Sequence, residues 1–332
     1  MLAQLVPPLI LLLAGCATHK EVELTQKILD LQHQLEQQQS YLSGCQDDNG
    51  MMQRGLIEKN NELNRARQMF PNTELAISGT RIPQRVRTEI QDGIAMAFAD
   101  GHFWPDHRSV AHAAFLRLAP QLKPAALIDV GDSLDGASIS RHPMTGNDDL
   151  PSVQDELYAV LEQRGELMEA CEGARLFWVP GNHCLRFDRY LAQNAPRMVG
   201  IKGMTLVDNL PGWKVAHGLE INWHTDPLLV LHNWKGGMHA SHGNAVASGV
   251  HFVSGHDHKL GCSRYTNERD TLYGINPGVF VDPGGPQFRY TQGRPKDWRS
   301  GFSVLTFVAG KILPPEHAEV VGKKVYFRGQ EL

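Results

Sequence analysis

Between residues 94 and 307, short apolar runs alternate with helix-like stretches, and this alternation constrains the fold more than any other feature of the chain. Apolar runs of 4 to 8 residues bounded by Gly, Pro and polar residues indicate buried strands. Strands that alternate with helices predict an α/β fold in which the strand ends share one rim. The apolar runs lie at residues 94–99, 125–130, 175–179, 228–231, 250–254 and 302–307, and the helix-like stretches at residues 110–118, 152–171 and 238–248.

Polar side chains directly follow five of these apolar runs. The third run shows the pattern most clearly, because it stops at Pro180-Gly181 and is followed by Asn182 and His183. In open α/β sheets, the carboxyl ends of the strands are where binding sites form. The other four clusters are Asp100-x-His102, Gly131-Asp132-x-x-Asp135, His232 and Gly255-His256-x-His258.

The side chains collected on this rim form a mixed set of carboxylate, amide and imidazole donors. Such a set suits Mn, Fe or Zn better than calcium, and seven donors are too many for one tetrahedral ion. Two divalent ions about 3.5–4 Å apart, sharing a carboxylate, would hold a bridging hydroxide and clamp phosphoryl oxygens. The sequence therefore predicts a metal-dependent hydrolase of phosphodiesters or phosphomonoesters. The seven candidate ligands are Asp100, His102, Asp132, Asn182, His232, His256 and His258.

Each motif also has a purely structural interpretation. Asp100-Gly101-His102 fits an ordinary turn, and Gly131-Asp132 fits a helix entry with aspartate as the cap. His232 is preferred over its neighbours as a ligand because it directly follows a predicted strand. Its competitors are His224, His239 and His242, whereas His217 and His251 are interpreted as ordinary surface or core histidines.

Taken in order, the five motifs resemble those of the calcineurin-like metallophosphoesterase superfamily over residues 94–307. The resemblance implies a four-layer α-β-β-α sandwich for residues 93–332 and two metal ions, with Mn preferred and Fe or Zn as alternatives. It also implies that His183 protonates the leaving alkoxide, while Asp135 hydrogen-bonds a ligand and orients it. By the same resemblance, Asp100, His102 and His258 would hold the first ion, Asp132 would bridge, and Asn182, His232 and His256 would hold the second.

Further segments, around Ser140-Arg141-His142 and after His183 and His232, are similar to phage and prophage phosphoesterases. Arg141 and His142 become candidate contacts for the substrate phosphate, with a solvated loop as the alternative. Nucleic acid is one candidate substrate, but a net charge of -4 provides no overall basic field for it. A nucleotide, a cyclic nucleotide or a phosphoester of the cell envelope is the alternative.

The chain departs from the superfamily pattern at Cys184, where Asp or Glu usually follows the histidine. A carboxylate there would orient the imidazole and keep it protonated. His183 is therefore expected to be a weaker acid unless Asp135 or Asp188 supplies the carboxylate.

Residues 1–16 are almost wholly apolar as far as Ala14 and end in Leu13-Ala14-Gly15-Cys16, which resembles a bacterial lipobox. The apolar run is shorter than the ~20 residues that span a bilayer. The expected outcome is a lipid on Cys16 and a membrane-anchored lipoprotein; the alternatives are an uncleaved signal anchor, or a wrongly assigned start with the protein in the phage or host cytoplasm.

A heptad pattern follows in residues 17–70, with apolar seam residues that include Leu24, Ile28, Leu31 and Leu35. It predicts a coiled-coil stalk that makes a homo-oligomer through residues 21–70, and residues 71–92 are expected to be a linker. The five cysteines have no CxxC spacing and indicate no disulfide framework. A second hypothesis is an anchored coiled-coil interaction protein whose phosphoesterase domain is catalytically weakened and retained for binding.

Overall fold

The computed structural model describes residues 81–141, 150–291 and 296–332. The predicted lipobox with Cys16 and the predicted coiled coil over residues 17–70 lie outside these residues. The expected linker, residues 71–92, needs a correction. Strand β1 (Val86–Thr88) pairs in parallel with β6 (Leu219–Ile221), and Ile90 is buried, so the folded unit begins before residue 93. The sequence did not reveal this strand because it is only three residues long.

Two sheets build the rim that the sequence predicts. The larger sheet contains, in spatial order, β15 (Gln330–Glu331), β14 (Lys324–Phe327), β13 (Glu316–Val321), β11 (Gly301–Val308), β2 (Gly93–Phe98), β3 (Ala126–Asp129), β4 (Arg175–Trp178) and β5 (Lys214–Val215), with β12 (Lys311–Ile312) paired to β11. The smaller sheet has the order β1, β6, β7 (Leu228–Val230), β8 (His251–Val253), β10 (Thr271–Asn276) and β9 (Gly261–Thr266).

The parallel direction of the strands brings the polar clusters to one edge of the sheet. Strands β2, β3, β4 and β5 run parallel, and Phe98, Asp129 and Trp178 are in register across the first three. The loops that follow these strands therefore leave the larger sheet from the same edge. In the smaller sheet β7 and β8 are also parallel, with Val230 opposite Val253.

Five α-helices lie in the part of the fold that the structure describes, and the starts of two of them follow the sequence closely. Helix α5 begins after Ser109, whose hydroxyl accepts a hydrogen bond from the His112 backbone, and α6 begins with a capping box between Ser152 and Asp155. Within residues 81–141, 150–291 and 296–332, no helix is both long enough and apolar enough to cross a bilayer. The helices are α5 (Val110–Leu122), α6 (Val153–Ala170), α7 (Arg186–Asn194), α8 (Leu206–Asn209) and α9 (Ala240–Ser248).

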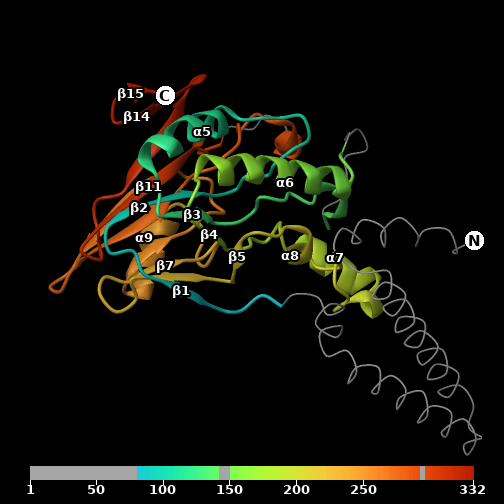
Figure 1. Cartoon of the computed structure of the whole chain (residues 1–332), viewed down its shortest axis with the longest axis horizontal. Coiled ribbons are helices and arrows are strands. Elements are labelled where there is room, and N and C mark those ends of the chain that lie inside the picture. The colour runs from blue at the N-terminus through green and yellow to red at the C-terminus, as the bar shows by residue number, and fades with distance from the viewer. Residues whose placement is uncertain (1–80, 142–149, 292–295) are drawn as a thin grey trace, which may run out of the picture. The chain divides into compact units, whose positions relative to one another are not determined.

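The layers follow from the alternation of side chains along β2. Met96 and Phe98 face α5 and α6, which lie side by side over this face of the larger sheet (Figure 1). Ala95 and Ala97 face the opposite way and pack, between the sheets, in a cluster with residues of the smaller sheet. Helix α9 covers the outer face of the smaller sheet. The packing order is therefore helices, larger sheet, smaller sheet, helix, as expected for an α-β-β-α sandwich.

Candidate metal centre

The seven candidate ligands come together where the two sheets meet, and we call them the rim patch: Asp100, His102, Asp132, Asn182, His232, His256 and His258. Asp100 and His102 follow β2, Asp132 follows β3, and Asn182 follows β4. His232 follows β7, and His256 and His258 follow β8. Strand ends from both sheets are therefore needed to complete the patch.

The first group of donors contains Asp100, His102 and His258, whose ligand atoms all lie within 4.8 Å of one another. The three side chains are buried. Nε2 of His258 lies 3.3 Å from Oδ1 of Asp100, yet this oxygen makes no hydrogen bond, and neither does the buried Nε2 of His102. Buried polar atoms that converge without bonding one another are characteristic of ligands to a shared cation.

The second group contains Asp132, His232 and His256, again with ligand atoms within 4.8 Å of one another. Nε2 of His232 lies 3.0 Å from Oδ2 of Asp132 and 3.2 Å from Oδ1 of Asn182. His256 is exposed to solvent, whereas Asp132 and His232 are buried. Asp132 also forms a group with His102 and His183, so it lies between the first and second groups, where a bridging carboxylate has to lie.

Hydrogen bonds behind two of the imidazoles orient them toward the patch. Nδ1 of His102 lies 2.8 Å from Oδ1 of Asp135, and Nδ1 of His232 lies 2.8 Å from the carbonyl oxygen of Val130. Because both partners only accept hydrogen bonds, Nδ1 carries a proton in each ring, and Nε2 faces the patch. A second residue that fixes the tautomer in this way is typical of metal-binding histidines.

The backbone of the patch is held in an unfavourable conformation. Five of its residues have positive φ angles, namely Asp100 at 54°, His102 at 34°, Asp132 at 54°, His256 at 71° and His258 at 58°. A non-glycine residue in this region costs about 1–3 kcal/mol, and such residues concentrate at functional sites. Packing alone gives no reason for five of them at one rim.

Gly181 allows the loop after β4 to pass directly over Asp132. A Cβ atom at this position would lie 2.1 Å from Oδ1 of Asp132 and 2.7 Å from Cε1 of His232. Oδ1 of Asp132 instead accepts a hydrogen bond of 2.8 Å from the backbone N–H of His183. The glycine is required by the close approach of the two loops.

The electrostatics of the patch favour a positive charge at its centre. Burial alone would raise the pKa of Asp132, but the His232 side chain beside it holds that pKa well below the usual range. Burial would lower the pKa of His232, but the carboxylates of Asp132 and Asp100 raise it to about 9. Together with the unpaired donor atoms and the mixture of oxygen and nitrogen donors, this shows that the residues fit a pair of divalent cations.

His183 lies beside the patch and is paired with Asp135. Nδ1 of His183 lies 2.7 Å from Oδ1 of Asp135, the same oxygen that faces His102. Burial would lower the pKa of His183, but the hydrogen bond to Asp135 raises it. Asp135 therefore supplies the carboxylate that the position of Cys184 does not. Asp188 is engaged elsewhere, because its carboxylate accepts from the Leu206 backbone.

Sequence reasoning missed the position of Arg186. Its Nη2 lies 3.1 Å from Nε2 of His183, and its Nη1 donates to the backbone carbonyl of Asp135 at 2.8 Å. Arg186 is the first residue of α7, three positions after His183. That spacing of three residues is the signal in the sequence that could have identified it.

Of the two predicted substrate contacts, Arg141 is exposed at the end of a described segment, and His142 lies outside the described residues. The structure shows no contact between Arg141 and the rim patch. His251 has the structural role expected of it, because its Nε2 lies 3.1 Å from Asp226 and its Nδ1 accepts from the Tyr273 backbone.

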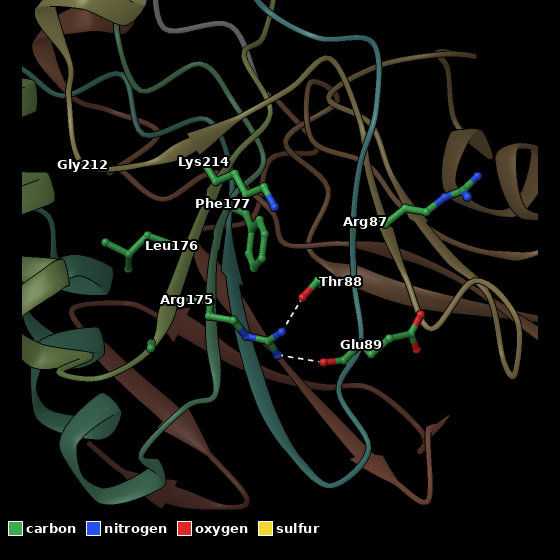
Figure 2. A pocket seen from close by; sticks show the side chains of 9 residues that line it. Arg87, Thr88, Glu89, Arg175, Leu176, Phe177, Gly212 and Lys214 are labelled. Carbon is green, nitrogen blue, oxygen red and sulfur yellow. Dashed lines mark hydrogen bonds between the residues drawn. The ribbon is translucent and has the colours of Figure 1, made fainter.

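A cavity of about 650 Å³ lies at the amino-terminal ends of β4 and β5, whereas the rim patch lies at the carboxyl-terminal ends of the strands (Figure 2). Arg175 and Lys214, the first residues of β4 and β5, contribute to its wall. Arg175 donates to Thr88 and to the Glu89 carbonyl, as Figure 2 shows, and Arg87 donates to Glu220. Two of the cavity's cationic side chains are therefore already paired. No residue of the rim patch is among those that line it.

A scan against models of protein families finds no match to this sequence, and a search of curated proteins finds none either. Solved structures with a similar arrangement include Vps29 from Chaetomium thermophilum, with 10% sequence identity and a TM-score of 0.36 over 72% of this chain and 97% of that chain. A dimetal phosphatase from Danio rerio has 12% identity and a TM-score of 0.35 over 73% of this chain and 98% of that chain. At these TM-scores neither likeness supports an inference about function, which depends on the geometry of the rim patch.

Proposed function

We propose that this protein is a phosphoesterase that uses two divalent metal ions, of the calcineurin-like metallophosphoesterase type. The observation that carries the proposal is the convergence of ligand atoms from five loops of two sheets on one rim, where the buried Oδ1 of Asp100 and Nε2 of His102 have no hydrogen-bond partner. Asp100, His102 and His258 would hold one ion, and Asn182, His232 and His256 would hold the other, with Asp132 shared between them.

When bound, a pair of divalent ions supplies Lewis acidity toward phosphoryl oxygens and a water molecule of lowered pKa. The residues of this chain would position the ions and control the access of solvent and substrate to them. The buried His102 and His258 exclude bulk solvent from one side, while the exposed His256 leaves the second site open to a substrate. A phosphoester could therefore reach the buried Asp132 from the side of His256 while both sheets stay intact.

His183 is the residue that we propose moves a proton. Asp135 holds its Nδ1, which stabilises the protonated ring and directs Nε2 away from that carboxylate. Arg186 lies against Nε2, so a substrate has to displace this contact before His183 can donate a proton to the leaving oxygen. His183 is thus the proposed general acid and Asp135 its positioning residue.

The proposal is tested by the hydrolysis of bis-p-nitrophenyl phosphate and p-nitrophenyl phosphate by the full-length protein with Mn²⁺. Asp132→Asn, which removes a shared charged ligand, should lower the rate on the preferred ester by roughly 100-fold or more. Asp226→Asn is the matched control, because Asp226 is also paired with a buried histidine but lies outside the rim patch. It should retain wild-type turnover.

The two esters also distinguish a diesterase, including a nuclease, from a monoesterase. A wild-type protein that hydrolyses neither ester with Mn²⁺, Fe²⁺ or Zn²⁺ would contradict the proposal. Equal rates for Asp132→Asn and the wild type would do the same. In either case, the second hypothesis, a domain retained for binding, would be favoured.

A further inference from the structure

Helix α6 buries charged and polar side chains on the face that it turns toward the larger sheet. Glu156, Gln163 and Arg164 are 0%, 1% and 2% exposed. Glutamate and arginine are almost never this buried unless they are paired. Positions 156, 160, 163, 164 and 167 lie on one side of a helix, so apolar side chains would be the ordinary choice there.

Two of the three side chains, those of Glu156 and Gln163, contact loops that carry rim-patch residues. The carboxylate of Glu156 accepts from the backbone N–H groups of Gly136 and Ala137 at 2.6 and 2.9 Å, directly after Asp135. Nε2 of Gln163 donates to the carbonyl of His107 at 3.1 Å, in the loop that follows His102. The helix therefore fixes the two loops that supply Asp100, His102, Asp132 and Asp135.

Arg164 acts on the loop that carries Asp132 and Asp135, through Asp129 at the end of β3. Its guanidinium lies between two indole rings, 4.5 Å from the centroid of Trp178 and 4.2 Å from that of Trp213. Its Nε lies 3.6 Å from Oδ2 of Asp129, and none of its nitrogens makes a hydrogen bond. Asp129 in turn accepts from the Gly131 backbone at 2.8 Å and from the Ser133 hydroxyl at 2.5 Å. It thus holds both neighbours of Asp132.

This arrangement is a poor way to gain stability. Burial lowers the pKa of Arg164 and raises that of Asp129, so both charges are destabilised where they lie. Buried ion pairs are often replaced by apolar residues with no loss of stability or with a gain. The geometry instead matches outer residues that hold metal ligands in place.

We infer that the buried face of α6 positions the metal ligands, with Glu156, Gln163 and the Arg164–Asp129 pair as positioning residues for the loops that carry Asp100, His102, Asp132 and Asp135. This inference rests on the proposed function, because it assigns these residues to the same metal centre. The indole rings of Trp178 and Trp213 hold the arginine by cation–π contact where hydrogen-bond partners are missing.

The test uses two variants of the full-length protein. One combines Asp129→Asn and Arg164→Met in the same chain, and the other, Leu167→Ala, is the control. Leu167 is a matched control because it lies on the same face of α6 and is buried in the apolar core. Removing its side chain should lower the melting temperature and leave the affinity of the folded protein for Mn²⁺ within about twofold. The double variant should do the opposite, with a melting temperature near that of the wild type and Mn²⁺ affinity weakened about tenfold or more.

Glu156→Gln provides a second variant that nearly preserves shape, in case the double variant does not fold. Its amide keeps one acceptor and loses the other, so we expect Mn²⁺ affinity to fall about tenfold. An unchanged Mn²⁺ affinity in every variant of this face that folds would overturn the inference.

Amide hydrogen exchange on the metal-free protein separates this inference from the proposed function. Peptides covering residues 129–139 should exchange at least about tenfold faster in Glu156→Gln than in the wild type, while the rest of the larger sheet stays unchanged. If the wild type binds no divalent ion, the proposed function fails and the exchange result still tests the positioning role. If exchange in these peptides is unchanged, the inference fails whatever the metal affinity.

Discussion

His183 takes its carboxylate partner from Asp135, which lies 48 residues earlier in the chain, and not from the residue beside it. The side chain of Cys184 lies in the apolar core instead of beside the His183 ring. It is fully buried and packs in the apolar cluster between the larger sheet and the helices. Burial, together with the charges of Asp132 and Asp129, raises the pKa of its thiol to about 12, so a negative charge is strongly disfavoured there.

Cys184→Asp should therefore destabilise the protein without improving catalysis. An unpaired carboxylate at this position would cost roughly 3 kcal/mol or more of unfolding free energy. Chemical denaturation of this variant beside Cys184→Ala measures the cost of the charge separately from the cost of the lost sulfur. A Cys184→Asp protein with wild-type stability and faster turnover on poor leaving groups would show that Asp135 does not serve as the partner of His183.

His317 predicts a pH dependence that is independent of the metal centre. Burial lowers its pKa to about 4, Nδ1 lies 3.0 Å from the Ser303 hydroxyl, and Nε2 has no hydrogen-bond partner. Below pH 6.5 the unfolded state takes up a proton that the folded state refuses, so stability falls as the pH falls from about 6.5 toward 4. From pH 7 to 5 this amounts to about 2 kcal/mol.

Unfolding free energies of the wild type and His317→Gln at pH 7 and pH 5 measure this effect. The wild type should lose about 2 kcal/mol more than the variant over this interval, because glutamine does not titrate. Equal losses would mean that His317 is protonated in the folded protein or is solvated.

At the scale of secondary-structure elements, the turn after β4 carries Gly181 and Asn182 of the proposed second metal site. Gly181→Ala would place a methyl group against the Asp132 carboxylate and the His232 ring. The strand itself should survive, because the change lies after its last residue, Trp178. We expect Gly181→Ala to stay folded and to bind at least one ion fewer per chain, as measured by metal analysis of the dialysed protein.

Gly173→Ala is the control for this substitution, since nothing lies within 4 Å of a Cβ at that turn. Gly173 has a positive φ and Gly181 does not, so the control carries the larger backbone cost and lacks only the contact with the metal-binding side chains. Equal metal content in both variants would show that the two loops can separate without losing an ion.

The sequence predicted that the candidate ligands share one rim, because each cluster follows an apolar run and these runs become β2, β3, β4, β7 and β8. It did not predict Arg186 or Arg164, because their partners are distant in the chain or depend on how a helix docks. The short strand β1 was missed for a related reason: three residues carry too little periodicity, and the strand exists only through its pairing with β6.

At the scale of the whole described unit, the proposed metal centre depends on the packing of two sheets. The larger sheet contributes four of the rim-patch residues and the smaller sheet three. Neither sheet alone has both complete groups of donors. The apolar cluster between the sheets therefore brings the two halves of the centre together, and the helix α6 fixes the loops on one side of it.

Anomalous diffraction from crystals of the full-length protein grown with Mn²⁺ tests the central claim most directly. We predict two anomalous peaks per chain, about 3.5–4 Å apart, with Asp132 in contact with both. Asp100, His102 and His258 should surround one peak, and Asn182, His232 and His256 the other. No peak at this rim, or a single peak that Asp132 does not touch, would contradict the proposed two-metal centre.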